Sequence, residues 1–310
     1  RHVDRQTVDT LTRLMREKYE QGIRDERKKR ATLPGLDGEP MSGLTPWREV
    51  VTPHEDVASG RFQQAEFAAD LWQVYRGGGE VKAEYGDPVH FFKRTYLTDG
   101  LRALLGTALK RLCGDAGDPI VELQTNFGGG KTHSMLALYH LFSGTPFAEM
   151  AGVEVLTADA GVKDKAKAVR RAVLVGTRIA PGQPSKKEDG TVVHTIWGEL
   201  AWQLGGKEGY KIVAEADRTS SGPGEALHTL LKSYAPCLIL IDEWVAYARQ
   251  LHDEGTLCGG SFETQFTFAQ TLTETVKNVE HAMLVVSIPA SDGVASPHMQ
   301  THTTDIEVGG

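Results

Sequence analysis

One stretch of the chain decides its fold: Ile120-Val-Glu-Leu-Gln-Thr-Asn-Phe-Gly-Gly-Gly-Lys-Thr132. It starts with strand-like apolar residues and leads through three glycines into Thr132–Phe142, where apolar residues recur at helical spacing. Consecutive glycines let backbone N–H groups surround a polyphosphate without steric conflict from Cβ atoms. The following helix directs its unpaired N–H groups and its dipole toward the same anion. The stretch therefore predicts a phosphate-binding loop of the Walker A type between a strand and a helix.

The whole loop is expected to contact a nucleotide, ATP. Lys131 would reach the β- and γ-phosphates, and the Thr132 hydroxyl would ligate Mg²⁺. His133 could approach a phosphate, although packing on the helix surface is the favoured interpretation. The first position of the full Gly-x-x-x-x-Gly-Lys-Ser/Thr pattern is a threonine here. The predicted nucleotide-binding residues are Thr125, Asn126, Phe127, Gly128, Gly129, Gly130, Lys131, Thr132 and His133.

A second segment supplies acidic residues where such a site needs them: Cys237-Leu-Ile-Leu-Ile-Asp-Glu243. Five apolar residues followed by two carboxylates are typical of a Walker B strand. Asp242 would hold Mg²⁺ through water, and Glu243 would polarise the attacking water as the catalytic base. The alternative is an ordinary acidic pair at a strand end.

The adjacent glutamate indicates the P-loop ATPases that have an extra strand between the loop strand and the Walker B strand. We expect Ala172–Gly176 to be that strand. The next strand, Ala282–Ser287, ends in a serine that we predict to sense the γ-phosphate, the alternative being a serine satisfied by backbone. No arginine finger can be assigned, since the arginines near the extra strand are expected to be structural or solvated. They are Arg170, Arg171 and Arg178.

Apolar strands that alternate with helices from Pro119 onward predict a parallel sheet covered on both faces. The fold class is α/β, a three-layer P-loop NTPase of the ASCE or AAA+-like type with a helical N-terminal extension. We expect a charged helix within 1–35, a helical region at 36–115, and the ATPase core at 116–310, cut short at its C-terminal end. Further helices are predicted at Gln63–Tyr75, Leu97–Leu112, His194–Leu204, Glu225–Tyr234 and Phe262–Val279, and an exposed loop at Gly182–Gly190.

Composition narrows the function classes. The 310 residues carry a net charge of −7, which argues against a protein that coats nucleic acid with its whole surface. No apolar run approaches the ~20 residues of a membrane-spanning helix, so no membrane role is expected. The three widely spaced cysteines fit a reducing compartment, and we expect a cytoplasmic protein.

The chain resembles the DUF499 family in several separate runs. The runs that carry the resemblance are Thr45-Pro-Trp-Arg-Glu-Val-Val-Thr-Pro-His54, Phe67-Ala-Ala-Asp70, Thr95-Tyr-Leu-Thr98 and Gln124-Thr-Asn-Phe-Gly-Gly-Gly-Lys-Thr-His-Ser-Met-Leu-Ala-Leu-Tyr139. The family's loop also has threonine at its first position. The resemblance implies a large AAA+-type ATPase found with bacterial anti-phage defence systems, including BREX-like ones, of which this chain is an N-terminal portion. It also implies a homo-oligomer, other defence-system proteins as partners, and indirect contact with DNA.

Three functions remain open from the sequence. The leading one is an ATP-hydrolysing motor or switch that remodels DNA or DNA-bound proteins. The second is a nucleotide-gated scaffold with little turnover that recruits partners. The third, a DNA-translocating helicase-like ATPase, is disfavoured by the acidic body of the chain.

Overall fold

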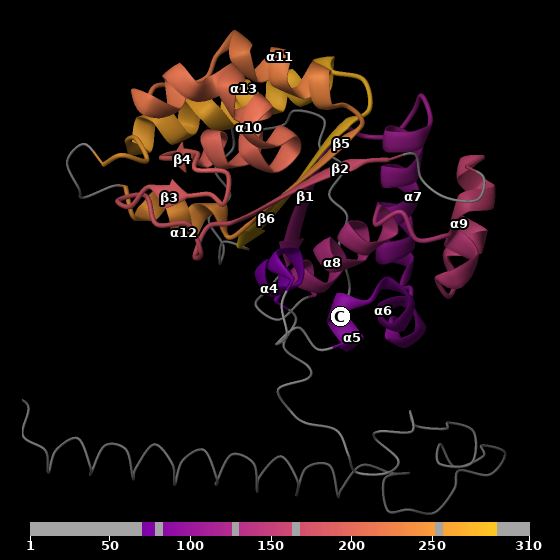
Figure 1. The fold of residues 1–310 in the computed structure, drawn as a ribbon. Helices are drawn as coiled ribbons and strands as arrows, with labels where there is room; N and C mark the ends of the chain where they lie inside the picture. The colour runs from indigo at the N-terminus through magenta and orange to yellow at the C-terminus, as the bar shows by residue number, and fades with distance from the viewer. Residues whose placement is uncertain (1–69, 78–82, 126–129, 163–167, 252–256, 290–310) are drawn as a thin grey trace, which may run out of the picture. The chain divides into compact units, whose positions relative to one another are not determined.

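The computed structural model describes residues 70–77, 83–125, 130–162, 168–251 and 257–289, all of them within one compact unit of the chain (Figure 1). Across these ranges, four strands form one fully parallel sheet in the order β1-β6-β5-β2. Their bounds are β1 Ile120–Thr125, β2 Arg170–Val175, β5 Cys237–Asp242 and β6 Ala282–Pro289.

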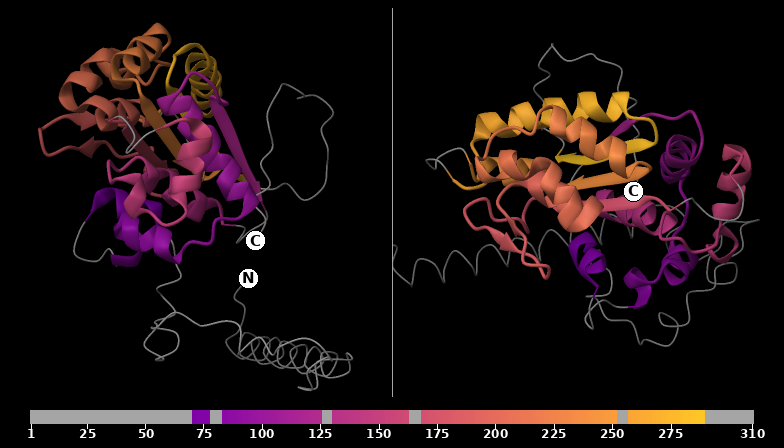
Figure 2. Two further views of the ribbon diagram at one scale, coloured as in Figure 1. Left: turned by 90° about the vertical axis from the view of Figure 1, so that its right-hand side faces the viewer. Right: turned by 45° about the horizontal axis from the view of Figure 1, so that its top comes forward.

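Helices cover both faces of this sheet, as Figures 1 and 2 show. All six residues of β5 are buried, and they alternate between two hydrophobic cores: Leu238 and Leu240 face one, Ile239 and Ile241 the other. A strand buried on both faces has to be apolar throughout, which is why its sequence shows no polar alternation. The predicted α/β class with a parallel sheet between helical layers is confirmed.

The two helical layers come from different parts of the chain. The first layer is formed by α4 (Leu71–Arg76), α6 (Pro88–Arg94), α7 (Asp99–Cys113), α8 (Lys131–Leu141) and α9 (Val153–Ala160), with α5 (Ala83–Gly86) and the 3₁₀ turn η2 (Phe147–Glu149) beside them. The second contains α10 (Ile196–Arg218), α11 (Glu225–Tyr234), α12 (Trp244–Arg249) and α13 (Phe262–Asn278). The helices at 71–113 thus share one core with the sheet.

The expected position of the extra strand is wrong. The strand predicted as Ala172–Gly176, which is β2, pairs only with the outer side of β5, and β6 lies between β1 and β5. The apolar content of β2 and β6 could not show which of them lies next to β1, because both strands are largely buried. What marks β2 is its outer edge, where the Gln203 side chain accepts from Val173 N at 2.6 Å and donates to Val173 O at 2.8 Å. A side-chain amide there satisfies backbone groups that a neighbouring strand would otherwise pair.

Other elements differ from the expectations in extent. The helix predicted at His194–Leu204 continues to Arg218 through a kink at Gly206, whose φ is 57°. The expected exposed loop at Gly182–Gly190 contains β3 (Ser185–Lys186), which pairs antiparallel with β4 (Val192–Val193). The charged helix predicted within 1–35 lies outside the described residues. No helix in the described ranges has the length and apolar character needed to cross a bilayer.

Candidate functional site

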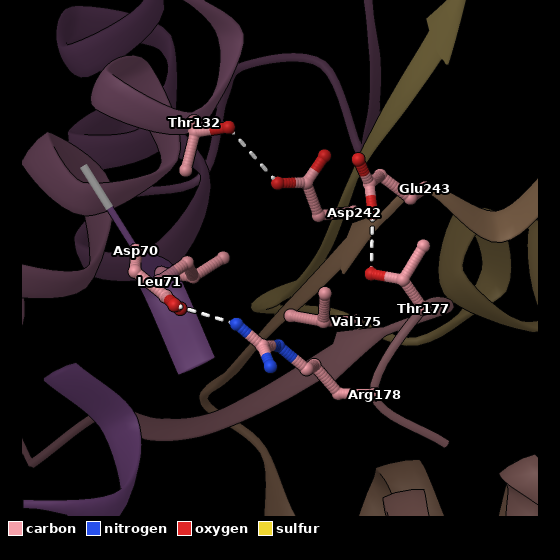
Figure 3. A pocket seen from close by; sticks show the side chains of 8 residues that line it. All are labelled: Asp70, Leu71, Thr132, Val175, Thr177, Arg178, Asp242 and Glu243. Atoms are coloured by element: carbon pink, nitrogen blue, oxygen red, sulfur yellow. Dashed lines mark hydrogen bonds and ion pairs between the residues drawn. The ribbon is translucent and has the colours of Figure 1, made fainter. Parts of the chain in front are cut away.

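A pocket of about 370 Å³ opens at the carboxyl ends of β2 and β5, beside the start of α8 (Figure 3). In open α/β sheets, ligands bind outside the carboxyl ends of the strands, where loops and helix N-termini converge. The pocket is lined by Asp70, Leu71, Thr132, Val175, Thr177, Arg178, Asp242 and Glu243.

The start of α8 is set by glycine. Gly130 is the N-cap residue and adopts the left-handed conformation, with φ 76° and ψ 12°, which costs glycine little. The cap makes no side-chain hydrogen bond within the described part of the chain. Lys131 is the first helical residue, and it is not among those that line the pocket. The predicted loop residues Asn126, Phe127, Gly128 and Gly129, and the side chain of Thr125, lie outside the described residues.

Asp242 is the centre of a hydrogen-bonded chain. It is the last residue of β5 and is only 6% exposed. Thr132 Oγ1 donates to its Oδ2 at 3.1 Å, and Ser287 Oγ donates to its Oδ1 at 2.5 Å. Ser287 Oγ also accepts from the backbone N–H of Glu243 at 3.0 Å. Three residues that the sequence predicted separately, 110 and 45 positions apart, are therefore brought together.

Glu243 begins the turn from β5 into α12. It is the N-cap residue of α12, in the left-handed conformation with φ 55°. Its Oε2 accepts from Thr177 Oγ1 at 2.5 Å. A non-glycine residue in this conformation is uncommon and is often found at functional sites.

The turn after β2 approaches β5 so closely that only glycine fits. A Cβ on Gly176 would lie 2.1 Å from the carbonyl oxygen of Glu243. The Gly176 N–H donates to Asp242 O at 2.8 Å, and the Arg178 N–H donates to Val175 O at 2.8 Å. The tight turn places Thr177 and Arg178 on the pocket wall, where Figure 3 draws both.

His133 packs away from this wall. Its Nε2 lies 3.1 Å from Thr95 Oγ1, and its ring centre lies 4.7 Å from that of Phe91 on α6. Burial lowers its pKa below the usual histidine range. The structure thus gives His133 the packing environment that the sequence favoured.

The three arginines separate into two roles. Arg170 Nη1 donates to Leu204 O at 3.1 Å. Arg171 Nη1 donates to Tyr139 O at 2.7 Å, and burial lowers its pKa. Both arginines therefore hold helices against β2. Arg178 instead lines the pocket, where its Nη2 lies 2.9 Å from Asp70 Oδ2.

Sequence reasoning missed Asp70 and Thr177 and gave Arg178 no functional role. Thr177 and Arg178 could have been found from their position directly after a buried strand, the same signal that pointed to Asp242 and Ser287. Asp70 carries no such signal, because it precedes a helix whose N-cap it forms: its Oδ1 accepts from Gln73 N at 3.1 Å.

The donor chemistry of the pocket suits a hard cation. A threonine hydroxyl and an aspartate carboxylate both offer oxygen, which Mg²⁺ prefers, and Mg²⁺ usually takes its remaining ligands from water and phosphates. In the described ranges no cluster of three or more His, Cys, Asp or Glu side chains could hold a metal. Thr132 and Asp242 could therefore hold Mg²⁺ together with a phosphate.

Comparisons with curated proteins and with solved structures gave no match. The model of one family, described as the DUF499 N-terminal domain, matches residues 48–306, which include every residue of the pocket and of the predicted loop. The chain belongs to the DUF499 family, as a copy of its N-terminal domain.

Proposed function

We propose that the chain is a P-loop ATPase that binds Mg·ATP at this pocket and hydrolyses it. The observation that carries the proposal is the hydrogen bond of 3.1 Å between Thr132 Oγ1 and Asp242 Oδ2. It joins the residue after the loop lysine to the acid at the end of a buried strand, the two side chains that hold Mg²⁺ in P-loop enzymes. The strand order adds support, because β6 separates β1 from β5 as the adjacent-glutamate class requires.

Each side chain of the site has a role in this proposal. The N-terminus of α8 and Lys131 would bind the β- and γ-phosphates. Thr132 and Asp242 would hold Mg²⁺, which neutralises charge on those phosphates when bound. Glu243 would accept the proton of the water that attacks the γ-phosphorus, so that the γ–β bridge breaks and ADP and inorganic phosphate form. Ser287 would fix both acids, through its bonds to Asp242 Oδ1 and Glu243 N.

The binding half of the proposal is tested at Lys131. Lys131→Ala removes the cation at the helix start, and we expect it to lose measurable binding of ATP and ADP in a calorimetric titration. Lys232→Ala is the matched control, since this exposed lysine belongs to α11 in the opposite helical layer. Unchanged ATP affinity in Lys131→Ala would contradict the assignment.

The catalytic half is tested at Glu243. Glu243→Gln keeps the side-chain shape but removes the base, so ATP should remain bound while phosphate release falls by at least ~100-fold. Normal turnover in this variant would exclude Glu243 as the base.

A second candidate, a nucleotide-gated scaffold with little turnover, is favoured by one contact. The hydroxyl of Thr177 donates to Glu243 Oε2 at 2.5 Å, so one of the two carboxylate oxygens is already engaged by a protein donor and not by a water. ATP binding without phosphate release from the wild-type chain would support the scaffold.

A role in anti-phage defence and remodelling of DNA-bound complexes is proposed only as an extension of the ATPase. Its test is phosphate release by the full-length protein with and without double-stranded DNA. Stimulation by DNA would favour the translocating enzyme, and equal rates would favour a protein substrate.

A further inference from the structure

We infer that Arg178 is a phosphate-contacting residue specific for the γ-phosphate, and that Asp70 competes with the nucleotide for it. The inference rests on the proposed ATPase function and adds to it a residue that discriminates ATP from ADP. It starts from the ion pair between Arg178 Nη2 and Asp70 Oδ2, 2.9 Å apart on the pocket wall (Figure 3).

The backbone holds Arg178 where a phosphate of this pocket could reach it. The Arg178 N–H donates to Val175 O at 2.8 Å, so the residue follows β2 in a tight turn. The preceding residue of the turn, Thr177, donates to the predicted base Glu243. Arg178 therefore lies in a short turn whose preceding residue contacts the predicted base.

The charges of the pocket need a cation on this wall. Among the described residues, its lining holds three carboxylates, from Asp70, Asp242 and Glu243, and one guanidinium, that of Arg178. Mg²⁺ would compensate Asp242, but a γ-phosphate would still lie among carboxylates. Arginine binds phosphate oxygens through a planar fork of parallel hydrogen bonds, so Arg178 is suited to compensate the added charge.

The existing pair is arranged so that it can exchange partners at low cost. The Arg178 side chain is 50% exposed and that of Asp70 is 25% exposed, and ion pairs as accessible as this are weak. Loss of the pair would not uncap α4, because Asp70 Oδ1 accepts separately from Gln73 N. A phosphate can therefore take the guanidinium while Asp70 remains the N-cap of its helix.

The test measures the affinities for ADP and for a non-hydrolysable ATP analogue, by calorimetry with Mg²⁺, in four variants of the chain. We expect Arg178→Gln to weaken binding of the analogue about tenfold or more and ADP by less than about twofold. Arg178→Lys, which keeps a cation but loses the fork, should lie between Arg178→Gln and wild type. Asp70→Asn, which preserves an N-cap acceptor, should strengthen binding of the analogue about threefold relative to ADP.

Arg218→Gln is the matched control, because Arg218 pairs with Glu215 on the exposed surface of α10. Neither affinity should change in it.

The outcomes separate this inference from the function on which it rests. If the pair only fastens α4, Arg178→Gln and Asp70→Asn will lower the melting temperature alike and leave the ratio of the two affinities unchanged, which overturns the inference alone. If Arg178→Gln does not fold, an unchanged ratio in Arg178→Lys and Asp70→Asn has the same meaning. If wild type binds neither nucleotide, or Lys131→Ala binds both normally, the proposed function fails and the inference with it.

Discussion

Two buried aspartates in two regions of the molecule each accept from two hydroxyls, but only Asp217 also accepts from backbone N–H groups among the described residues. Asp217, in the second half of α10, is fully buried, and Asp242, at the end of β5, is 6% exposed. Asp217 accepts from the backbone N–H groups of His194 and Thr195, from the Thr195 hydroxyl and from the Tyr210 hydroxyl, at 2.6–3.1 Å. Asp242 accepts from two hydroxyls, those of Thr132 and Ser287.

The difference between these donors separates a structural acid from a candidate functional one. Backbone N–H groups cannot turn away, so Asp217 permanently joins the start of α10 to its kinked second half. Hydroxyl groups can rotate, and their oxygens can ligate a cation, so Asp242 can change partners when a ligand enters. Asp242 also lines the pocket, whereas Asp217 is not among the residues that line it.

The largest effect is expected from paired Asp→Asn substitutions. Asp217→Asn places an amide NH₂ against fixed N–H donors and should lower the free energy of unfolding by about 3 kcal/mol or more. Asp242→Asn meets hydroxyls that can turn to accept, so we expect a loss within about 1 kcal/mol, together with at least ~100-fold slower phosphate release. Urea unfolding and a phosphate assay on both variants measure the two effects. Equal losses of stability in the two variants would contradict the distinction between a structural Asp217 and a functional Asp242.

Much of the fold could be predicted because the sheet and its helices carry strong local patterns. The bounds predicted for α11, Glu225–Tyr234, are those of the structure. The continuation of α10 could not be predicted, because two adjacent glycines look like a helix end. In the fold, Gly205 lies against Tyr234, where a Cβ would be 2.1 Å from the ring. The glycine at position 205 is required by a contact with another helix, and the local sequence pattern gives no sign of that contact.

The candidate site could be predicted where its residues belong to the loop motif or end an apolar, strand-like run. Asp242 and Ser287 were proposed in this way, Thr132 was proposed from the loop motif, and the structure brings the three together. Thr177 and Asp70 acquire their importance from partners 66 and 108 positions away, namely Glu243 and Arg178. The order of strands, which decides such pairings, is a property of the whole sheet and not of any segment.

A smaller effect is expected when a single hydroxyl next to each of the two aspartates is removed. Ser287→Ala leaves Glu243 N and one oxygen of Asp242 without their partner, so we expect a loss of about 1–2 kcal/mol in unfolding free energy and about tenfold slower phosphate release. Thr195→Val should cost a similar ~1–2 kcal/mol, because Thr195 is the N-cap of α10 and donates to Asp217. It should leave phosphate release unchanged. If Thr195→Val slows turnover as much as Ser287→Ala does, the two acids are not functionally distinct.

The smallest effect on stability concerns the hydroxyl that touches Glu243. Thr177→Val preserves shape at an exposed position, so unfolding free energy should change by no more than about 0.5 kcal/mol. The hydrogen bond occupies one oxygen of the proposed base, and its removal should free that oxygen for a water and raise phosphate release about threefold or more. Thr177→Ser keeps the hydroxyl and should behave as wild type, and Thr177→Val should have no effect in a chain that also carries Glu243→Gln. A fall in turnover in Thr177→Val would instead mean that Thr177 holds Glu243 in its productive orientation, which would make this hydroxyl a structural donor like those that hold Asp217.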